Sequence, residues 1–153
     1  MDPVIIAIAA DHAGRPLLER VVDALHAGGD DTVLVGPAAD DLADDYPDIA
    51  RAVGAAVLSG AAGRGIAICG SGAGVAVAAS KMRGIRAAVA HDVYTAHQMV
   101  EHDDVNVLCL GARVVGSEVA AELVTAFAGA RFSGAERHLR RLAKVAEIEA
   151  TGG

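Results

Sequence analysis

Short apolar runs and helical apolar stripes alternate along the chain. Runs typical of buried strands lie at residues 4–10, 32–35, 65–69, 86–90 and 107–110. Apolar residues at helical spacing lie between them: Leu17, Leu18, Val21, Val22 and Leu25, then stripes within 47–58, 93–101 and 117–128. Strands that alternate with helices favour an α/β fold, with a five-stranded parallel sheet covered by helices on both faces.

Several residues mark where these helices begin. Three candidate N-caps precede predicted helices: Asp45, Asp92 and Ser117. Pro47 falls in a first turn, where proline is well tolerated. Ser133 and Glu136 have the spacing of a capping box and predict the start of a last helix. The one long polar loop is predicted at residues 36–45.

The last helix has a narrow apolar face. That face consists of Leu139, Leu142 and Val145. The opposite side is basic and carries Arg137, Arg140, Arg141 and Lys144. This pattern is typical of a helix that packs outside its own core. We expect one domain at residues 1–149, followed by a disordered tail at 150–153.

Composition excludes several classes of function. Hydrophobic residues make up 53% of the chain but aromatic residues only 3%, which suits close packing of helices on a sheet. A net charge of −7 argues against nucleic-acid binding.

No apolar run approaches the ~18 residues of a membrane span, and the start lacks a basic leader, so we expect a cytoplasmic protein. Two cysteines with no C-x-x-C pair predict reduced thiols and no metal site.

A cysteine lies where an apolar strand runs into a glycine-rich turn. Cys69 ends the strand at 65–69, and Gly70, Gly72 and Gly74 come next, ahead of a predicted helix at 75–79. Backbone N–H groups at such a turn attract anions and lower the pKa of a nearby thiol. Cys69 is therefore a candidate nucleophile or base, although a buried core cysteine is an equally ordinary interpretation. The dinucleotide and P-loop fingerprints are both absent.

Titratable residues follow four of the five predicted strands. Asp11 and His12 follow the first, Cys69 the third, His91 and Asp92 the fourth, and Arg113 the last. Ligands bind at the carboxyl ends of parallel strands, so these side chains are expected to share one edge of the sheet. Asp11 also has a simpler interpretation as a helix cap. His102 lies at the end of a predicted helix, where it is either a positioned acid or base or, more commonly, a solvated histidine. His97 and His102 do not have the i, i+4 spacing of two metal ligands on a helix.

Taken together, these motifs resemble the ribose-5-phosphate isomerase B family, which includes the subunits of galactose-6-phosphate isomerase. The resemblance is colinear from about residue 4 to 148 and is carried by Asp11-His12-Ala13-Gly14, Asp45-Tyr46-Pro47, Cys69-Gly70-Ser71-Gly72-Ala73-Gly74, Lys81 with Gly84-Ile85-Arg86, Glu101-His102-Asp103-Asp104-Val105-Asn106, Gly111-Ala112-Arg113 and Arg137-His138-Leu139-Arg140-Arg141. The order and spacing of so many motifs make the match specific.

The resemblance implies a Rossmann-like three-layer α/β sandwich. It also implies an aldose–ketose isomerase of phosphorylated sugars that uses no metal or other cofactor. The implied assembly is a homodimer or homotetramer with its sites between subunits, in which the last helix packs on the partner and delivers arginines. The expected partner molecule is a small phosphorylated sugar, with no nucleic acid or membrane.

The resemblance also assigns site residues. Cys69 is then the base that moves a proton between C2 and C1 through an enediolate, which Ser71 and the N–H groups of Gly70, Gly72 and Gly74 stabilise. His102 opens the sugar ring. The expected sugar contacts are Asp11, Tyr46 and Asp103, and the expected phosphate ligands are His12, Arg113, Arg137 and Arg141, with His138 as a possible helper. Members without the cysteine use a glutamate at the position of Val75, so this chain follows the cysteine variant.

The substrate is less constrained than the reaction. Ribose 5-phosphate, converted to ribulose 5-phosphate, is the first expectation. Many family members have asparagine at the position of Asp103, and an ionised aspartate donates no hydrogen bond. The stretch from 101 to 113 also resembles isomerases of the four-carbon D-erythrulose 4-phosphate. Since a fold does not fix a function, the chain is also compatible with a non-catalytic phosphosugar or nucleotide-binding module, or with a structural subunit of a two-component isomerase.

Overall fold

A computed structural model describes residues 3–37 and 44–153. Within these residues, five strands form one parallel sheet in the order β2-β1-β3-β5-β4. The strands are β1 (Ile5–Ala10), β2 (Asp31–Leu34), β3 (Arg64–Cys69), β4 (Ala87–Val89) and β5 (Val107–Gly111). The predicted five-stranded parallel sheet is confirmed, and no strand limit differs from the prediction by more than one residue.

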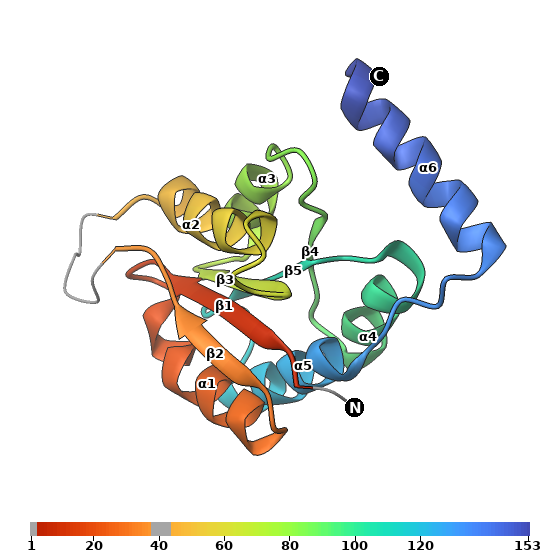
Figure 1. Cartoon of the computed structure of the whole chain (residues 1–153). Coiled ribbons are helices and arrows are strands. Elements are labelled where there is room, and N and C mark those ends of the chain that lie inside the picture. The colour runs from red at the N-terminus through yellow and green to blue at the C-terminus, as the bar shows by residue number, and fades with distance from the viewer. Residues whose placement is uncertain (1–2, 38–43) are drawn as a thin grey trace.

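Helices cover both faces of the sheet, so the fold is a three-layer α/β sandwich (Figure 1). One layer holds α1 (Leu18–Ala27), α4 (Val93–Asp103) and α5 (Ser117–Gly129), and a short 3₁₀ turn at Arg15–Leu17 leads into α1. The other layer holds α2 (Tyr46–Leu58) and α3 (Ala73–Ala79).

The strands present large side chains to one layer and small ones to the other. Ile66 and Ile68 of β3 join the core beneath α1, α4 and α5, whereas Ala67 and Cys69 face α2 and α3. This alternation is the period of two expected of a strand. It places the Cys69 thiol on the side of the sheet that α2 and α3 cover.

The three candidate N-caps differ in the structure. Asp92 caps α4 as predicted, because its carboxylate accepts the N–H of Thr95 at 2.7 Å. Asp45 occupies the N-cap position of α2 without a side-chain capping bond. The prediction for Ser117 is wrong: Gly116 is the N-cap of α5, and Ser117 is the first helical residue.

The predicted capping box of the last helix is also wrong. In α6 (Glu136–Thr151) the N-cap is Ala135, and Glu136 is already helical. The hydroxyl of Ser133 accepts the N–H of Ala135 at 3.2 Å and pairs with the His138 ring at 2.5 Å instead. The hydroxyl that the sequence pattern assigns to a helix cap thus bonds to Ala135 and His138 instead.

Helix α6 extends from the side of the molecule beside α4 (Figure 1). Its apolar residues Leu139, Val145 and Ile148 are 52%, 49% and 60% exposed. The helix continues to Thr151 and ends at Gly152, whose φ of +80° is left-handed, so the predicted disordered tail is wrong for its first two residues.

Two further expectations concern membranes and the polar loop. No helix in residues 3–37 and 44–153 is both long and apolar enough to cross a bilayer. The centre of the predicted loop at 36–45, residues 38–43, lies outside the described residues.

Candidate active site

Cys69 ends β3, and its sulfur is held by the turn that follows. The thiol accepts the backbone N–H of Gly72 at 3.1 Å, and the residue is only 5% exposed. Gly72 has φ +83°, a conformation that glycine adopts without strain, and this lets the chain reverse into α3. The next N–H, that of Ala73, is donated to the Ser71 hydroxyl at 3.2 Å. The turn therefore fixes both side chains from its own backbone.

Backbone contacts lock three strand ends together beneath this turn. The N–H of Asp11 donates to the carbonyl of Ile68 at 3.1 Å, and the N–H of Ala112 donates to that of Cys69 at 2.9 Å. Glycine is required where the segments touch. A Cβ on Gly14 would lie 2.2 Å from the Ile68 oxygen, and one on Gly111 would lie 2.5 Å from the Ser71 carbonyl carbon. The ends of β1, β3 and β5 thus form one rigid floor.

Above this floor lies an open cleft of about 360 Å³. The residues that line it come from the turns after β1, β3 and β5 and from the starts of α2 and α3: Asp11, His12, Ala13, Tyr46, Cys69, Gly70, Ser71, Gly74, Arg113 and Val114. The Tyr46 ring forms one wall and lies so close to Gly74 that a Cβ there would be 3.0 Å from it. The prediction that the strand ends share a site holds for the residues after β1, β3 and β5, whereas His91 and Asp92, which follow β4, are not among the lining residues. Gly72, which holds the sulfur, is not among those that line the cleft.

Asp11 has a structural bond as well as a place in the cleft. It is 6% exposed, and its Oδ1 accepts the N–H of Gly14 at 2.8 Å. This bond closes the turn after β1, but Asp11 is not a helix cap, because the N-cap of the 3₁₀ helix that follows is Gly14.

The sequence analysis did not single out Asp44, which has a fully buried carboxylate. Its Oδ1 accepts two donors of His12, the backbone N–H at 3.0 Å and Nδ1 at 2.9 Å. Its Oδ2 accepts Arg15 Nη2 at 2.8 Å. Asp44 belongs to an acidic segment of the sequence. Residue spacing in that segment does not distinguish a buried carboxylate with ion-pair partners from a solvated one. No local signal identifies it.

The remaining predicted residues form a second group, away from the cleft lining of this chain. His102 ends α4 and His138 begins α6, and their rings stack with centroids 4.1 Å apart. His138 is 2% exposed. Burial lowers its pKa, the positive charges of His102, Arg137 and Arg141 lower it further, and Asp103 opposes them. The structure therefore gathers His102, Asp103, Arg137, His138 and Arg141 around the α4–α6 contact.

Comparison with known proteins decides the family. The model of the ribose/galactose isomerase family matches residues 6–145 of the chain. The chain belongs to this family.

Characterised relatives of the ribose/galactose isomerase family resemble this chain over most of its length. Ribose-5-phosphate isomerase B of Escherichia coli is 40% identical over 144 residues, which cover 94% of this chain and 95% of that protein. D-erythrulose-4-phosphate isomerase 2 of Mycolicibacterium smegmatis is 43% identical over 131 residues, 83% of this chain and 85% of that protein. The structure of Trypanosoma brucei type B ribose 5-phosphate isomerase has a TM-score of 0.90 at 41% identity, covering 96% of this chain and 99% of that chain.

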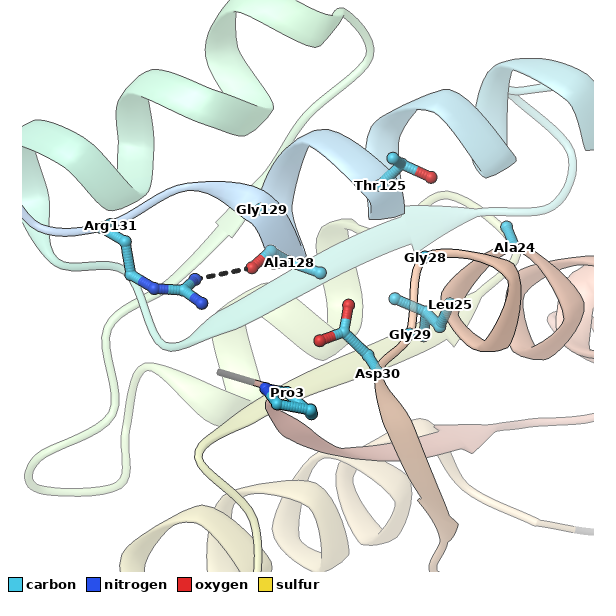
Figure 2. Close-up of a pocket in the computed structure, with 10 residues that line it drawn as sticks. All are labelled: Pro3, Ala24, Leu25, Gly28, Gly29, Asp30, Thr125, Ala128, Gly129 and Arg131. Carbon is cyan, nitrogen blue, oxygen red and sulfur yellow. Dashed lines mark hydrogen bonds between the residues drawn. The ribbon is translucent and has the colours of Figure 1, made fainter. Parts of the chain in front are cut away.

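The structure has another cavity at the opposite end of the strands. It encloses about 270 Å³ between the ends of α1 and α5 (Figure 2). Its polar groups bond within the protein: Asp30 accepts the N–H of Val4 at 3.0 Å, and Arg131 donates to the carbonyls of Ala128 and Ala130 at 2.9 Å each. None of its lining residues is a cysteine, serine or histidine. The chemistry of the chain is concentrated in the cleft around Cys69 instead.

The two thiols of this family member differ. Cys109 of β5 has no exposed surface, and burial together with the neighbouring Cys69 raises its pKa to about 12. Cys109 is therefore a core residue, whereas Cys69 reaches the cleft. In the part of the chain that the structure describes, no group of three or more His, Cys, Asp or Glu side chains is arranged to hold a metal ion.

Proposed function

We propose that the protein is an aldose–ketose isomerase of phosphorylated sugars that interconverts ribose 5-phosphate and ribulose 5-phosphate. One observation carries the proposal. The Cys69 thiol, held by a backbone N–H, opens into the same cleft as Ser71, His12 and Arg113. A base, hydroxyl and N–H donors, and two groups that bind phosphate thus surround a space of about 360 Å³, which suits a small sugar phosphate.

In the proposed reaction, Cys69 acts as a thiolate. It takes the proton from C2 of the open-chain aldose, and the electron pair of that C–H bond forms the C1=C2 double bond of an enediolate. The negative charge on O1 is stabilised by the Ser71 hydroxyl and the turn N–H groups. Cys69 returns the proton to C1, and the proton of the O2 hydroxyl moves to O1, so that O2 becomes the carbonyl oxygen of the ketose. Val75 is fully buried and apolar and offers no alternative base.

At the other end of the sugar, His12 and Arg113 bind the phosphate. Both line the cleft, and guanidinium and imidazolium donors make charge-assisted hydrogen bonds to phosphate oxygens. Tyr46 and Asp11 flank the sugar between phosphate and thiol.

The second group of residues enters the site through a homodimer. His102, Asp103, Arg137, His138 and Arg141 do not line the cleft of their own chain. Helix α6 carries three exposed apolar residues, Leu139, Val145 and Ile148, which a partner subunit would cover. In the proposed dimer each subunit offers its own α4–α6 contact to the partner's cleft, where His102 opens the ring, Asp103 contacts the sugar and the two arginines reach the phosphate.

The test is NMR of the protein in D₂O with ribose 5-phosphate. Isomer formation with deuterium entering next to the carbonyl supports the mechanism. Cys69→Ala should lose at least about a thousandfold in kcat, because the proton-transfer group is gone. Cys109→Ala removes the other thiol and should retain turnover. Turnover by Cys69→Ala at the wild-type rate overturns the assignment of the base.

A second substrate is supported by the 43% identity to D-erythrulose-4-phosphate isomerase 2 of M. smegmatis. A four-carbon sugar phosphorylated at its last carbon cannot close a five-membered ring, so His102 would have no ring to open. The same experiment with D-erythrulose 4-phosphate separates the two candidates. Turnover of the four-carbon sugar alone would replace the first substrate and make Asp103 a specificity residue.

A further inference from the structure

Asp44 lies against His12 at the edge of the cleft. The side chain of Asp44 is fully buried, whereas that of His12 is 48% exposed. Three donors converge on the two carboxylate oxygens: the His12 backbone N–H at 3.0 Å, His12 Nδ1 at 2.9 Å and Arg15 Nη2 at 2.8 Å. A buried carboxylate with a donor on each oxygen has one orientation, and so does the ring it holds.

The charge of Asp44 decides which ring nitrogen of His12 carries a proton. Burial alone would raise the pKa of Asp44, but the two hydrogen bonds of His12 and the charge of Arg15 outweigh it and keep the pKa below its ordinary value. An ionised carboxylate only accepts hydrogen bonds, so Nδ1 of His12 carries a proton. The other ring nitrogen, Nε2, is then the one available to a ligand in the cleft that His12 lines.

We propose that Asp44 is a positioning residue that holds His12 with Nδ1 protonated and presents Nε2 to the phosphate group of the substrate. When the ring carries a proton on both nitrogens, Nε2 donates a charge-assisted hydrogen bond to a phosphate oxygen. Arg15 completes the device by occupying the second oxygen of Asp44. The identity of the ligand rests on the proposed function, whereas the arrangement of His12, Asp44 and Arg15 does not.

The first test reads the ring directly. In ¹⁵N NMR of the uniformly labelled protein, Nδ1 of His12 should have the shift of a protonated nitrogen across pH 6–8. In Asp44→Ala that signal should move toward the shift of an unprotonated nitrogen at the upper end of this range. An Nδ1 that is unprotonated in the wild-type protein, or unchanged in Asp44→Ala, overturns the proposal.

The second test separates positioning from folding. Asp44→Asn should raise KM for ribose 5-phosphate by about tenfold and change kcat by less than about threefold, because the phosphate contact is weakened while Cys69 is untouched. Glu118→Gln is the matched control, since its 78% exposed carboxylate pairs with Arg20 outside the cleft and its loss should leave both constants unchanged. A fall in kcat as large as the rise in KM, or a lower melting temperature with unchanged kinetics, would assign Asp44 to folding alone.

A third measurement keeps this inference apart from the proposed function. Titration with inorganic phosphate should show about tenfold weaker binding to Asp44→Asn than to the wild-type protein, whether or not either turns over a sugar. Absence of turnover by the wild-type protein would defeat the proposed function and leave this comparison intact. Equal phosphate affinities of Asp44→Asn and the wild-type protein would overturn the positioning role of Asp44, even where the wild-type protein turns over the sugar.

Discussion

The rings of His102 and His138 stack with their centroids 4.1 Å apart and an angle of 28° between their planes. His138 is enclosed by the protein, and its Nδ1 pairs with the Ser133 hydroxyl at 2.5 Å. That hydroxyl already accepts the N–H of Ala135, so its proton is available to donate to Nδ1. Burial and the neighbouring positive charges lower the pKa of His138, which favours a neutral ring stacked on that of His102.

The stability of the protein should fall in acid partly because of His138. Its pKa is lowered by burial and by the charges of His102, Arg137 and Arg141, so between the folded and unfolded values the unfolded chain binds more protons. This contribution is complete above the ordinary histidine pKa of about 6.5 and is lost as the pH falls below it. Urea unfolding from pH 8 to 5 should show a shallower pH dependence for His138→Gln than for the wild-type protein.

His91→Gln is the control for the urea experiment. It removes an exposed histidine, so its curve shows how much of the change in pH dependence comes from losing any titratable ring. Parallel curves for the wild-type protein and His138→Gln would contradict the assignment.

The floor of the cleft should not tolerate a methyl group. Gly14 has φ −83°, which alanine adopts freely, so any cost of Gly14→Ala comes from the 2.2 Å approach of its Cβ to the Ile68 oxygen. We expect a loss of about 1–3 kcal/mol in the free energy of unfolding, measured by urea denaturation. Gly129→Ala is the control. Its Cβ meets nothing within 4 Å in α5, so alanine should stabilise the helix by about 0.5–1 kcal/mol.

Alkylation should distinguish the two cysteines. At a pKa of about 12, Cys109 is roughly one part in 10⁵ thiolate at pH 7 and has no exposed surface, so iodoacetamide should leave it unmodified in the native protein. Cys69, which reaches the cleft, should be modified, and ribose 5-phosphate should slow the reaction. Mass spectrometry of the digested protein reads both sites. Similar labelling of Cys109 and Cys69 before unfolding would show that Cys109 is not enclosed in the core.

The exposed apolar face of α6 should hold a dimer together. Val145→Asp and Ile148→Asp place charges at residues that are 49% and 60% exposed. Light scattering after gel filtration should show a dimer for the wild-type protein and a monomer for each variant. Arg140→Asp, on the basic side of the same helix, should remain dimeric. A wild-type monomer, or dimers in all three variants, would contradict the proposed assembly.

The sheet could be predicted from the sequence because its strands are apolar runs separated by helical stripes. The same reasoning brought Asp11, Cys69 and Arg113 to one edge, since each directly follows a strand that the pattern identifies. Asp44 could not be found in this way. Its role depends on His12 and Arg15, which are 32 and 29 residues away and reach it only in the folded chain.

Two local patterns failed at the ends of α6. The capping box at Ser133 failed because its hydroxyl accepts the N–H of Ala135 and pairs with the His138 ring. The tail prediction failed because Ala150 and Thr151 continue the helix, which ends at Gly152. The separation of Arg137 from the cleft has no local signal either, because it depends on the direction in which α6 leaves the body of the molecule.

The glycine contacts beneath Cys69 also bear on how this enzyme fold can diversify. Where main chain meets main chain at Gly14 and Gly111, no larger residue fits, so substitutions cannot reshape the bottom of the cleft. New substrate preferences can arise instead at side chains around the mouth, such as Tyr46 and Arg113. In the proposed reaction, the main chain beneath the reacting end of the sugar would then stay the same, while the length and stereochemistry of the rest are left open to selection.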